Sequence, residues 1–473
     1  MSAKSATKTI AVNTAVQIVG KVFILVLAAV SIGILTRYLG AEGYGKFSLA
    51  LVYLSLFGIV GDLGLFTIAV REMTRNPKRM QEIVANTLSL RALMAFVVFL
   101  VAIGVAWLLP YTPDVRIAVA IAAFSHFFGL LNSTMVTVFL TNLKMGYSVI
   151  SDIAGRAVSL GAVIYVATAD LGFYAVVATA ALGSLVTFSV STWLARRFVK
   201  IRFYRDVALW KGMLKEALPL GAALVVSQLY YRIDILLLAF LRTPAEVGVY
   251  SAVFKVLELL LTLPLFFLNS VFPVMIQRLE HEAERAKPLI QKSFDLLLIG
   301  GVAFAAGGLA LAPDIMRIIG GSEFVSGGNA LRVILFAMVL TFMVMAFVNL
   351  YVAKGRQIQA LKIGLVGLVI NTGLNLIFIP VYGMVGAAVV TLLSELVIFG
   401  LYLRGSRRSL NLPISMRNLP RVLLAGAVMA AVMWPLRHNF VLAFVTGGAV
   451  YVTMILGLGL VSREVIRELT ARS

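Results

Sequence analysis

Hydrophobic runs of about 20 residues follow one another along nearly the whole chain, separated by short polar segments. Runs of this length are typical of α-helices that cross the hydrocarbon core of a membrane. Two of the breaks, at 170–172 and 382–383, are so short that each predicts a tight turn between two helices. The pattern predicts fourteen membrane-spanning helices, near 12–36, 48–70, 86–109, 116–140, 149–168, 172–194, 216–240, 247–273, 290–312, 329–350, 359–379, 383–403, 419–436 and 440–461.

Composition supports lipid as the surroundings of these helices. Hydrophobic residues make up 61% of the 473 residues, charged residues make up 13%, and the mean hydropathy is +0.99. Average globular proteins have roughly 45–50% apolar and about 25% charged residues. A soluble fold could not bury so much apolar surface. The predicted fold class is therefore an all-α polytopic membrane protein.

Basic residues are distributed unevenly between the two predicted sides of the membrane. With the N-terminus in the cytoplasm, 30 of the 41 lysines and arginines fall in cytoplasmic segments, including the tail with Arg463, Arg467 and Arg472, and four fall inside spans. Cytoplasmic loops carry such an excess, which predicts a multi-pass protein of the cell (inner or plasma) membrane with both termini cytoplasmic. The same effect explains the net charge of +20 without a nucleic-acid partner. The seven outer basic residues are Arg37, Lys46, Arg116, Arg242, Arg317, Arg332 and Arg437.

Two segments near the membrane surface carry further expectations. The first span lacks a short hydrophobic region followed by a small-residue cleavage site, so we expect it to remain as a helix. The cytoplasmic connection near 195–215 combines arginines and lysines with aromatic residues, which predicts an interfacial helix lying on anionic lipid. Its basic and aromatic residues include Arg196, Arg197, Lys200, Arg202, Phe203, Tyr204, Arg205 and Trp210.

Groups that could perform chemistry are scarce. The chain has no cysteine, and its three histidines are far apart with no metal-ligand spacing. The longest predicted outer segment, 313–329, offers only Asp314 and Glu323 as acid–base groups. A membrane-embedded polysaccharide polymerase or glycosyltransferase would be expected to carry paired carboxylates or histidines in sizeable outer loops. We therefore expect no enzyme activity, no cofactor and no metal site, with the membrane enzyme as an alternative of a different class.

The stretch GAEGYGKFS, residues 40–48, resembles a phosphate-binding loop. Phe47 stands where such a loop requires the hydroxyl of a serine or threonine, and no strand precedes it. The motif has an echo 203 residues later, where Gly248, Tyr250 and Ser251 repeat Gly45, Phe47 and Ser48. The echo drops the lysine, so we interpret both copies as turns between helices, with Gly40, Gly43 and Gly45 supplying the turn backbone.

This internal repeat predicts the domain organisation. A second echo relates 171–180 to 382–391, with an offset of 211 residues. The chain therefore reads as an N-terminal lobe of six helices and a linker (1–205), a C-terminal lobe of six helices (206–408) and two additional helices (409–473). An even number of spans keeps both lobes in one orientation, about an axis along the membrane normal. Two such lobes facing each other predict a central cavity that opens to either side in turn.

Two stretches carry a resemblance to a known family. The run from Ile34 to Glu72, ILTRYLGAEGYGKFSLAL…GDLGLFTIAVRE, is similar to the opening of the polysaccharide (Wzx-like) flippases of the multidrug/oligosaccharidyl-lipid/polysaccharide exporter superfamily. The run YYRIDILLLAFLRTPAEVGVYSAVFKVLELLLTLPLFFLNSVFPVM, 230–275, resembles the seventh-to-eighth helix region of that family. The resemblance covers the whole chain through its fourteen helices. It implies transport of a polyprenyl-pyrophosphate-linked oligosaccharide, with membrane lipids and other polysaccharide-assembly membrane proteins as partners.

Ionisable residues inside the predicted spans are the candidate site residues, because a charge at mid-membrane usually faces a cavity or a partner. Lys21, Arg91, Arg232 and Lys255 would line a cationic cavity for a pyrophosphate or an acidic sugar. Asp62, Asp234, Glu258 and Glu395 are candidates to carry a coupling proton or sodium ion.

The alternative for these charges is structural. Pairs such as Asp62 with Arg91, or Asp234 with Lys255, would lock helices together. The pair of Asn371 and Asn375 would either bond between helices or contact sugar. A second transport function, cation-coupled drug export within the same superfamily, is less favoured, because such exporters use acidic residues for cationic drugs and basic residues stand out here.

Overall fold

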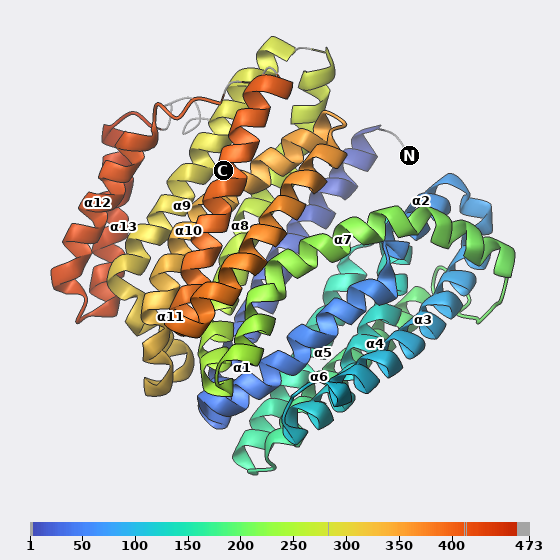
Figure 1. Cartoon of the computed structure of the whole chain (residues 1–473). Helices are drawn as coiled ribbons and strands as arrows, with labels where there is room; N and C mark the ends of the chain where they lie inside the picture. The colour runs from blue at the N-terminus through green and yellow to red at the C-terminus, as the bar shows by residue number, and fades with distance from the viewer. Residues whose placement is uncertain (1–2, 282, 411, 413, 461–473) are drawn as a thin grey trace. The chain divides into compact units, whose positions relative to one another are not determined.

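The structure is a computed structural model that describes residues 3–281, 283–410, 412 and 414–460, with only the backbone for 3–16, 18, 273, 280–281, 283, 285 and 409. The predicted C-terminal basic group at Arg463, Arg467 and Arg472 lies outside the described residues. The described chain is all-helical, without a strand (Figure 1). The helices are α1 (Ala3–Asp62), α2 (Leu65–Arg75), α3 (Met80–Leu108), α4 (Pro113–Thr141), α5 (Gly146–Thr168), α6 (Phe173–Ala195), α7 (Val207–Leu241), α8 (Pro244–His281), α9 (Ala283–Gly320), α10 (Gly328–Ala353), α11 (Gln357–Ser409), α12 (Leu419–Leu436) and α13 (Phe440–Gly457), with 3-10 turns η1 (Pro77–Arg79) and η2 (Ser322–Gly327).

Twelve helical stretches in the described part of the chain are long and apolar enough to cross a membrane. Two of them, in α1 and α11, are far longer than one crossing and contain a glycine with positive φ: Gly40 (φ 66°) and Gly383 (φ 58°). Glycine adopts this conformation without steric cost, so the helix can bend sharply there. Counted as two segments each, α1 and α11 bring the number of spans close to the fourteen predicted. The all-α polytopic fold class is confirmed.

The halves of α11 run antiparallel from the bend at Gly383. The Tyr402 hydroxyl donates to the Ala360 carbonyl at 3.4 Å, and a Cβ added to Gly386 would lie 2.6 Å from the Phe378 oxygen. In both contacts the two residues are nearly equidistant from the bend, as a helical hairpin requires. Figure 1 shows this hairpin in orange. The tight turn predicted at 382–383 is therefore present, and a comparable turn with Asp170 (φ 48°) and Gly172 (φ 82°) separates α5 from α6.

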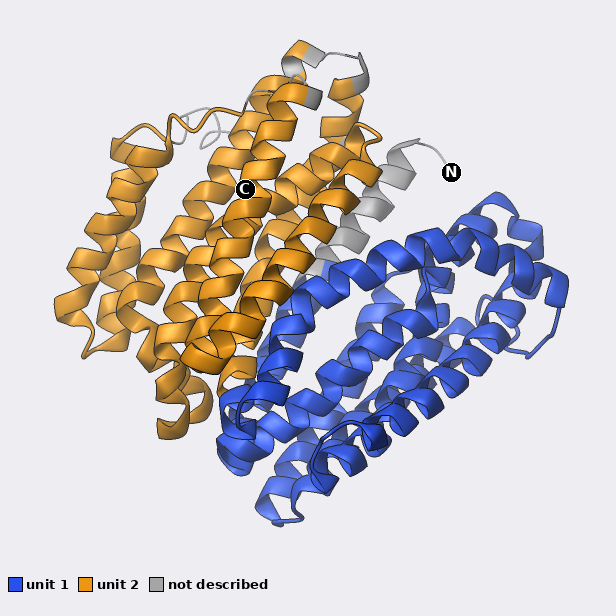
Figure 2. Cartoon of the chain, viewed as in Figure 1, with its two compact units in different colours: residues 1–248 blue, residues 249–473 orange. Residues whose placement is uncertain are grey.

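The chain divides into two compact units, residues 1–248 and 249–473 (Figure 2). Unit 1 holds α1 to α7, and unit 2 holds most of α8 and then α9 to α13. The sequence instead begins the second lobe at residue 206, before α7. The division into compact units groups α7 with the first six spans because α7 packs against α1, α2 and α3. The predicted lobe boundaries remain a prediction.

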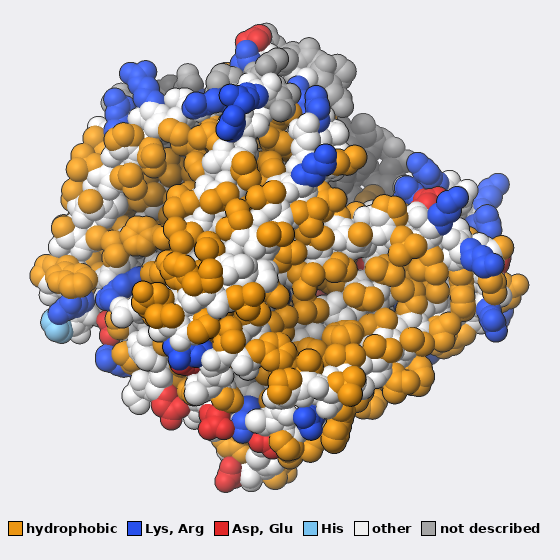
Figure 3. Space-filling model, in the orientation of Figure 1, with side chains coloured by type: hydrophobic (Ala, Val, Ile, Leu, Met, Phe, Trp, Pro, Cys, Tyr) orange, Lys and Arg blue, Asp and Glu red, His pale blue; other side chains and the backbone are white. Residues whose placement is uncertain are grey.

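Apolar side chains cover the helices from outside as well as inside. Phe96, Leu100 and Phe124 in unit 1, and Val369, Ile377 and Phe444 in unit 2, are all more than half exposed. Figure 3 shows such side chains over the visible faces of the helices, with lysines and arginines gathered towards helix ends. Exposed apolar surface of this extent is suited to lipid rather than to water, so the chain is a multi-pass membrane protein.

The basic connection between α6 and α7 corrects one prediction. Residues 200–206 form no helix. Their backbone is held by side chains of α3: Lys200 N–H donates to Gln81 (2.7 Å) and Tyr204 N–H donates to Ser89 (2.9 Å). The predicted interfacial helix was wrong here because α3 supplies hydrogen-bond partners that compete with intrahelical bonds.

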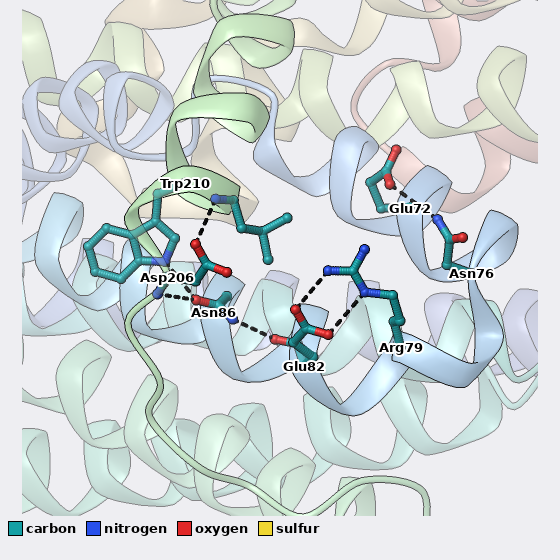
Figure 4. Close-up of polar contacts among 8 residues, drawn as sticks. Glu72, Asn76, Arg79, Glu82, Asn86, Asp206 and Trp210 are labelled. Atoms are coloured by element: carbon teal, nitrogen blue, oxygen red, sulfur yellow. Dashed lines mark hydrogen bonds and ion pairs between the residues drawn. The ribbon is translucent and has the colours of Figure 1, made fainter.

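The end of this connection is fixed by Asn86. Its side-chain oxygen accepts hydrogen bonds from Asp206 N–H (2.8 Å) and from the Trp210 indole N–H (3.1 Å) (Figure 4). The Asp206 carboxylate in turn accepts from Leu209 N–H at 3.0 Å and caps the N-terminus of α7. A carboxylate at this position satisfies a backbone donor that the helix leaves open, so α7 begins at Val207.

The two copies of the glycine motif pack against each other. A Cβ added to Gly45 would overlap the Pro244 carbonyl, and one added to Gly248 would overlap the Ala41 carbonyl. Of the three glycines expected to form a turn, Gly40 has the bent backbone, whereas Gly43 and Gly45 lie within the helix that follows. The assignment of Gly43 and Gly45 to the turn was wrong. Gly45 instead lets the backbone of α1 approach that of α8.

Candidate functional site

In unit 1, the candidate residues Asp62 and Arg91 form an ion pair. Arg91 on α3 is fully buried, and its Nη2 donates to Asp62 Oδ1 at 2.6 Å. Its Nη1 donates to the Thr134 hydroxyl on α4 at 2.9 Å. The guanidinium thus joins three helices, and the pair considered from sequence is present.

The position of Asp62 follows from a bend in the chain. Asp62 is the last residue of α1, and Leu63 (φ 45°) and Gly64 (φ 83°) follow in left-handed conformations before α2 begins. α7 covers this bend closely, since a Cβ added to Gly221 would lie 2.7 Å from the Leu63 oxygen. Asp62 is therefore held at a junction of α1, α2, α3 and α7, with its side chain 20% exposed.

The candidate Lys21 lies elsewhere in unit 1. It is exposed on the first half of α1 and is close enough to Asp152 on α5 to interact with that carboxylate electrostatically. The neighbouring Gly20 packs so tightly against Val149 that a Cβ would overlap it. Lys21 therefore belongs to the contact between α1 and α5, together with Asp152 and Arg156.

Arg232 and Asp234 lie near the end of α7. Asp234 is 2% exposed, and its Oδ1 accepts a hydrogen bond from Ile235 N–H at 2.8 Å. Arg232 is half-buried. A buried carboxylate inside a membrane helix is costly, which favours a functional role for Asp234.

In unit 2, the candidates Lys255 and Glu258 pair within α8. The ammonium of Lys255 lies 2.7 Å from Glu258 Oε2, and both side chains are partly exposed. Spacing of three residues places both groups on the same helix face. The positive charge of Lys255 is therefore paired with the negative charge of Glu258.

The remaining candidate, Glu395, is a buried polar residue of α11, as are Asn371 and Asn375. Asn375 Nδ2 donates to Asn371 Oδ1 at 2.9 Å, and Asn371, Asn375 and Glu395 are each at most 3% exposed. Asn371 and Glu395 are both twelve residues from the bend at Gly383, so the antiparallel halves place them at the same depth. At 1.5 Å per residue this depth is about 18 Å from the bend, close to the middle of a hydrocarbon core about 30 Å thick.

Asn371, Asn375 and Glu395 carry side-chain oxygens of the kinds that bind hard cations. Hard cations bind carboxylate and amide oxygens, and a carboxylate can also take up a proton. Asn375 Oδ1 is buried without a hydrogen-bond partner among the described residues. The described residues contain no cluster of three histidine or acidic side chains that could hold a metal ion. Sequence reasoning paired Asn371 with Asn375 but did not group them with Glu395; their equal distance from Gly383 is the signal that could have done so.

Two known protein families match parts of this sequence. Residues 10–278 match the family described as polysaccharide biosynthesis protein. The match covers more than half of the chain. The chain belongs to the polysaccharide biosynthesis protein family. Residues 219–377 also match the MatE family, which agrees with the resemblance to the multidrug/oligosaccharidyl-lipid/polysaccharide exporter superfamily.

Two relatives from Haloferax volcanii are named as flippases. "Probable flippase AglR" is 24% identical over 265 residues, which cover 52% of this chain and 54% of that protein. "Probable low-salt glycan biosynthesis flippase Agl15" is 25% identical over 173 residues, 35% of each chain. The match thus spans about half of the length of the first relative and about a third of the second.

The fold is shared over nearly the whole chain with a solved structure titled "Lipid II flippase MurJ, inward closed conformation". The TM-score is 0.80 at 15% identity, and the superposition covers 95% of this chain and 99% of that one. At this identity the likeness shows the fold. It agrees with the fold that the resemblance implied. The two relatives and this structure are all named as flippases rather than as enzymes.

Proposed function

We propose that this protein is a flippase that moves a polyprenyl-pyrophosphate-linked oligosaccharide from the cytoplasmic to the outer leaflet of the cell membrane. The observation that carries the proposal is the family match over 10–278, together with relatives named as flippases. Transport proceeds by alternating access of the two lobes. The product serves cell-surface polysaccharide assembly such as O-antigen, and membrane lipids and polysaccharide-assembly proteins are the partners.

The substrate's pyrophosphate is recognised by basic side chains within the spans. Of the four candidates, Arg91 donates to Asp62 and Thr134 and is fully buried, so we assign it to positioning α1, α3 and α4. We assign phosphate binding to Lys21, Arg232 and Lys255, whose side chains are half-buried or exposed, whereas that of Arg91 is fully buried. Guanidinium and ammonium groups bind phosphate oxygens through charge-assisted hydrogen bonds.

Coupling to a proton or sodium ion belongs to the buried acids. Glu395 with Asn371 and Asn375 supplies three oxygen-bearing side chains at one depth in α11. Asp234 is the second buried carboxylate among the candidates. Asp62 and Glu258 are less buried than Asp234 and Glu395, so we rank them below these two acids.

Drug export is the second candidate, because the MatE match spans 219–377. The two functions differ in the charge of the ligand. A lipid-linked pyrophosphate is an anion, whereas the drugs of such exporters are cations.

Ligand binding to the purified protein in detergent tests the proposal. We expect a polyprenyl-pyrophosphate saccharide to raise the melting temperature of the protein, and the cation ethidium to leave it unchanged. Arg232→Gln and Lys255→Gln should each weaken the saccharide's affinity by about tenfold, the loss of one charge-assisted bond. Lys144→Gln, an exposed residue after α4, is the control and should bind as the wild type. Stabilisation by ethidium alone would favour the exporter and contradict the flippase.

A further inference from the structure

A second group of basic residues lies at one end of unit 2, outside the candidate site. Arg317 ends α9, Arg332 begins α10, and Arg437 and His438 connect α12 to α13. Together with Asp314 they line a cavity of about 320 Å³. Figure 3 shows basic side chains and a histidine gathered at the lower left, where α12 meets α13 in Figure 1.

The charges of this cavity do not balance. Asp314 is the one carboxylate that lines the cavity, and it pairs with Arg317 at 3.1 Å. Arg332 donates to the Leu309 carbonyl (3.0 Å) and to the Asn329 side chain (2.9 Å), both neutral. Arg437 stacks on the Trp434 ring at 4.6 Å. Among the described residues, Arg332 and Arg437 have no ion pair, so two positive charges face the cavity uncompensated.

The hydrogen bonds of Arg332 also hold its guanidinium in place. A side chain ordered in this way loses less conformational entropy when it binds an anion. A cavity with excess positive charge and a fixed guanidinium is a site for a phosphate-sized anion.

The parts of α12 and α13 next to Arg437 and His438 carry an exposed apolar surface, which is suited to contact with lipid. Trp434, Val441, Phe444 and Val445 on α12 and α13 are each about half exposed or more. Phe440 and Phe444 stack with their ring centroids 6.3 Å apart. A free phosphate would leave this surface unused, whereas the acyl chains of a lipid would cover it while the headgroup occupies the cavity.

We infer that this cavity binds the phosphate headgroup of an anionic membrane lipid, with the acyl chains lying along α12 and α13. By the predicted topology this lipid belongs to the outer leaflet. This lipid site does not depend on the proposed transport function, and the two are tested separately.

Photoaffinity labelling of the full-length protein in liposomes tests this site. The probe is phosphatidylglycerol with a diazirine in its acyl chain, and labelled peptides are mapped by mass spectrometry. We expect labelling between 434 and 445 that unlabelled phosphatidylglycerol competes for, and that phosphatidylcholine and inorganic phosphate do not.

Variants make the test specific. Arg437→Gln, an exposed residue whose loss should not disturb folding, should lower labelling of this segment about tenfold, and Arg332→Gln should act likewise. Arg421→Gln, at the opposite end of α12, is the matched control and should label as the wild type. Unchanged labelling in both cavity variants would overturn the inference. Equal competition by inorganic phosphate would assign the cavity to a free anion instead, and equal competition by phosphatidylcholine would show unspecific lipid contact; either result also overturns it.

Discussion

Arg91 is the largest of the fully buried side chains in the described structure. Removing an arginine from water costs several kcal/mol unless a partner compensates its charge. Asp62 on α1 supplies the opposite charge, and Thr134 on α4 accepts a further hydrogen bond. The pair therefore fixes where α1 ends relative to α3 and α4.

Removing the negative charge of Asp62 should destabilise the protein. We expect Asp62→Asn to lower the free energy of unfolding by about 3–5 kcal/mol, because an uncompensated charge is left buried. Denaturant unfolding of the purified protein in detergent, followed by circular dichroism, measures the change. The double variant Asp62→Leu/Arg91→Met should recover most of the loss. An Asp62→Asn protein as stable as the wild type would contradict the structural role of this pair.

Some of these side-chain contacts could be predicted from the sequence and others could not. The pairing of Asp62 with Arg91 was among the alternatives, because both lie in the same third of neighbouring spans. The spacing of Lys255 and Glu258 allowed their contact, but it was not proposed. The second partner of Arg91, Thr134, does not follow from spacing, since it depends on which faces of α3 and α4 meet. The shared depth of Asn371 and Glu395, by contrast, follows from their equal distance to Gly383.

At the scale of elements, the repeated glycine motif joins α1 to α8. Gly45 and Gly248 leave so little space that a methyl group on either would overlap a carbonyl of the other segment. The sequence identified the two copies as a repeat, but their interpretation as turns was wrong for Gly45 and Gly248, which lie within α1 and α8. It could not show that they touch, because a repeat offset carries no information on packing.

Adding one methyl group at this crossing should be costly. We expect Gly45→Ala to destabilise the protein by about 1–3 kcal/mol through overpacking, even though alanine is the better helix former. Gly104→Ala on α3 is the matched control, because nothing lies within 4 Å of its added Cβ. Thermal unfolding of the two variants in detergent measures the difference. If Gly45→Ala melts at or above the temperature of Gly104→Ala, the close crossing is wrong.

At the scale of the whole molecule, hydrophobic periodicity was the strongest signal in the sequence. It predicted the all-α membrane fold and both helix-terminating turns, because the length of an apolar run is set directly by membrane thickness. The helix predicted from basic and aromatic composition is absent at 200–206, where backbone N–H groups donate hydrogen bonds to the side chains of Gln81, Ser89 and Asn86. Such tertiary partners cannot be read from local composition.

The predicted topology is directly testable because the chain has no native cysteine. We expect Ser322→Cys, in the exposed turn η2, to react in intact cells with a membrane-impermeant maleimide. Ser415→Cys, exposed before α12, should react only after permeabilisation. These outcomes follow from the excess of basic residues on the cytoplasmic side. Labelling in the reverse order would place both termini outside and contradict the charge-based orientation.

Translocation itself is the most direct test of the central claim. The full-length protein is reconstituted into liposomes with a fluorescent polyprenyl-pyrophosphate saccharide in both leaflets, and a membrane-impermeant quencher is added outside. The account predicts that quenching proceeds from about half of the probe, its outer-leaflet share, towards completion. It should be faster with an imposed proton or sodium gradient, and slower in Arg232→Gln and Glu395→Gln. Quenching that stops at the level of protein-free liposomes, under every gradient, would contradict the flippase.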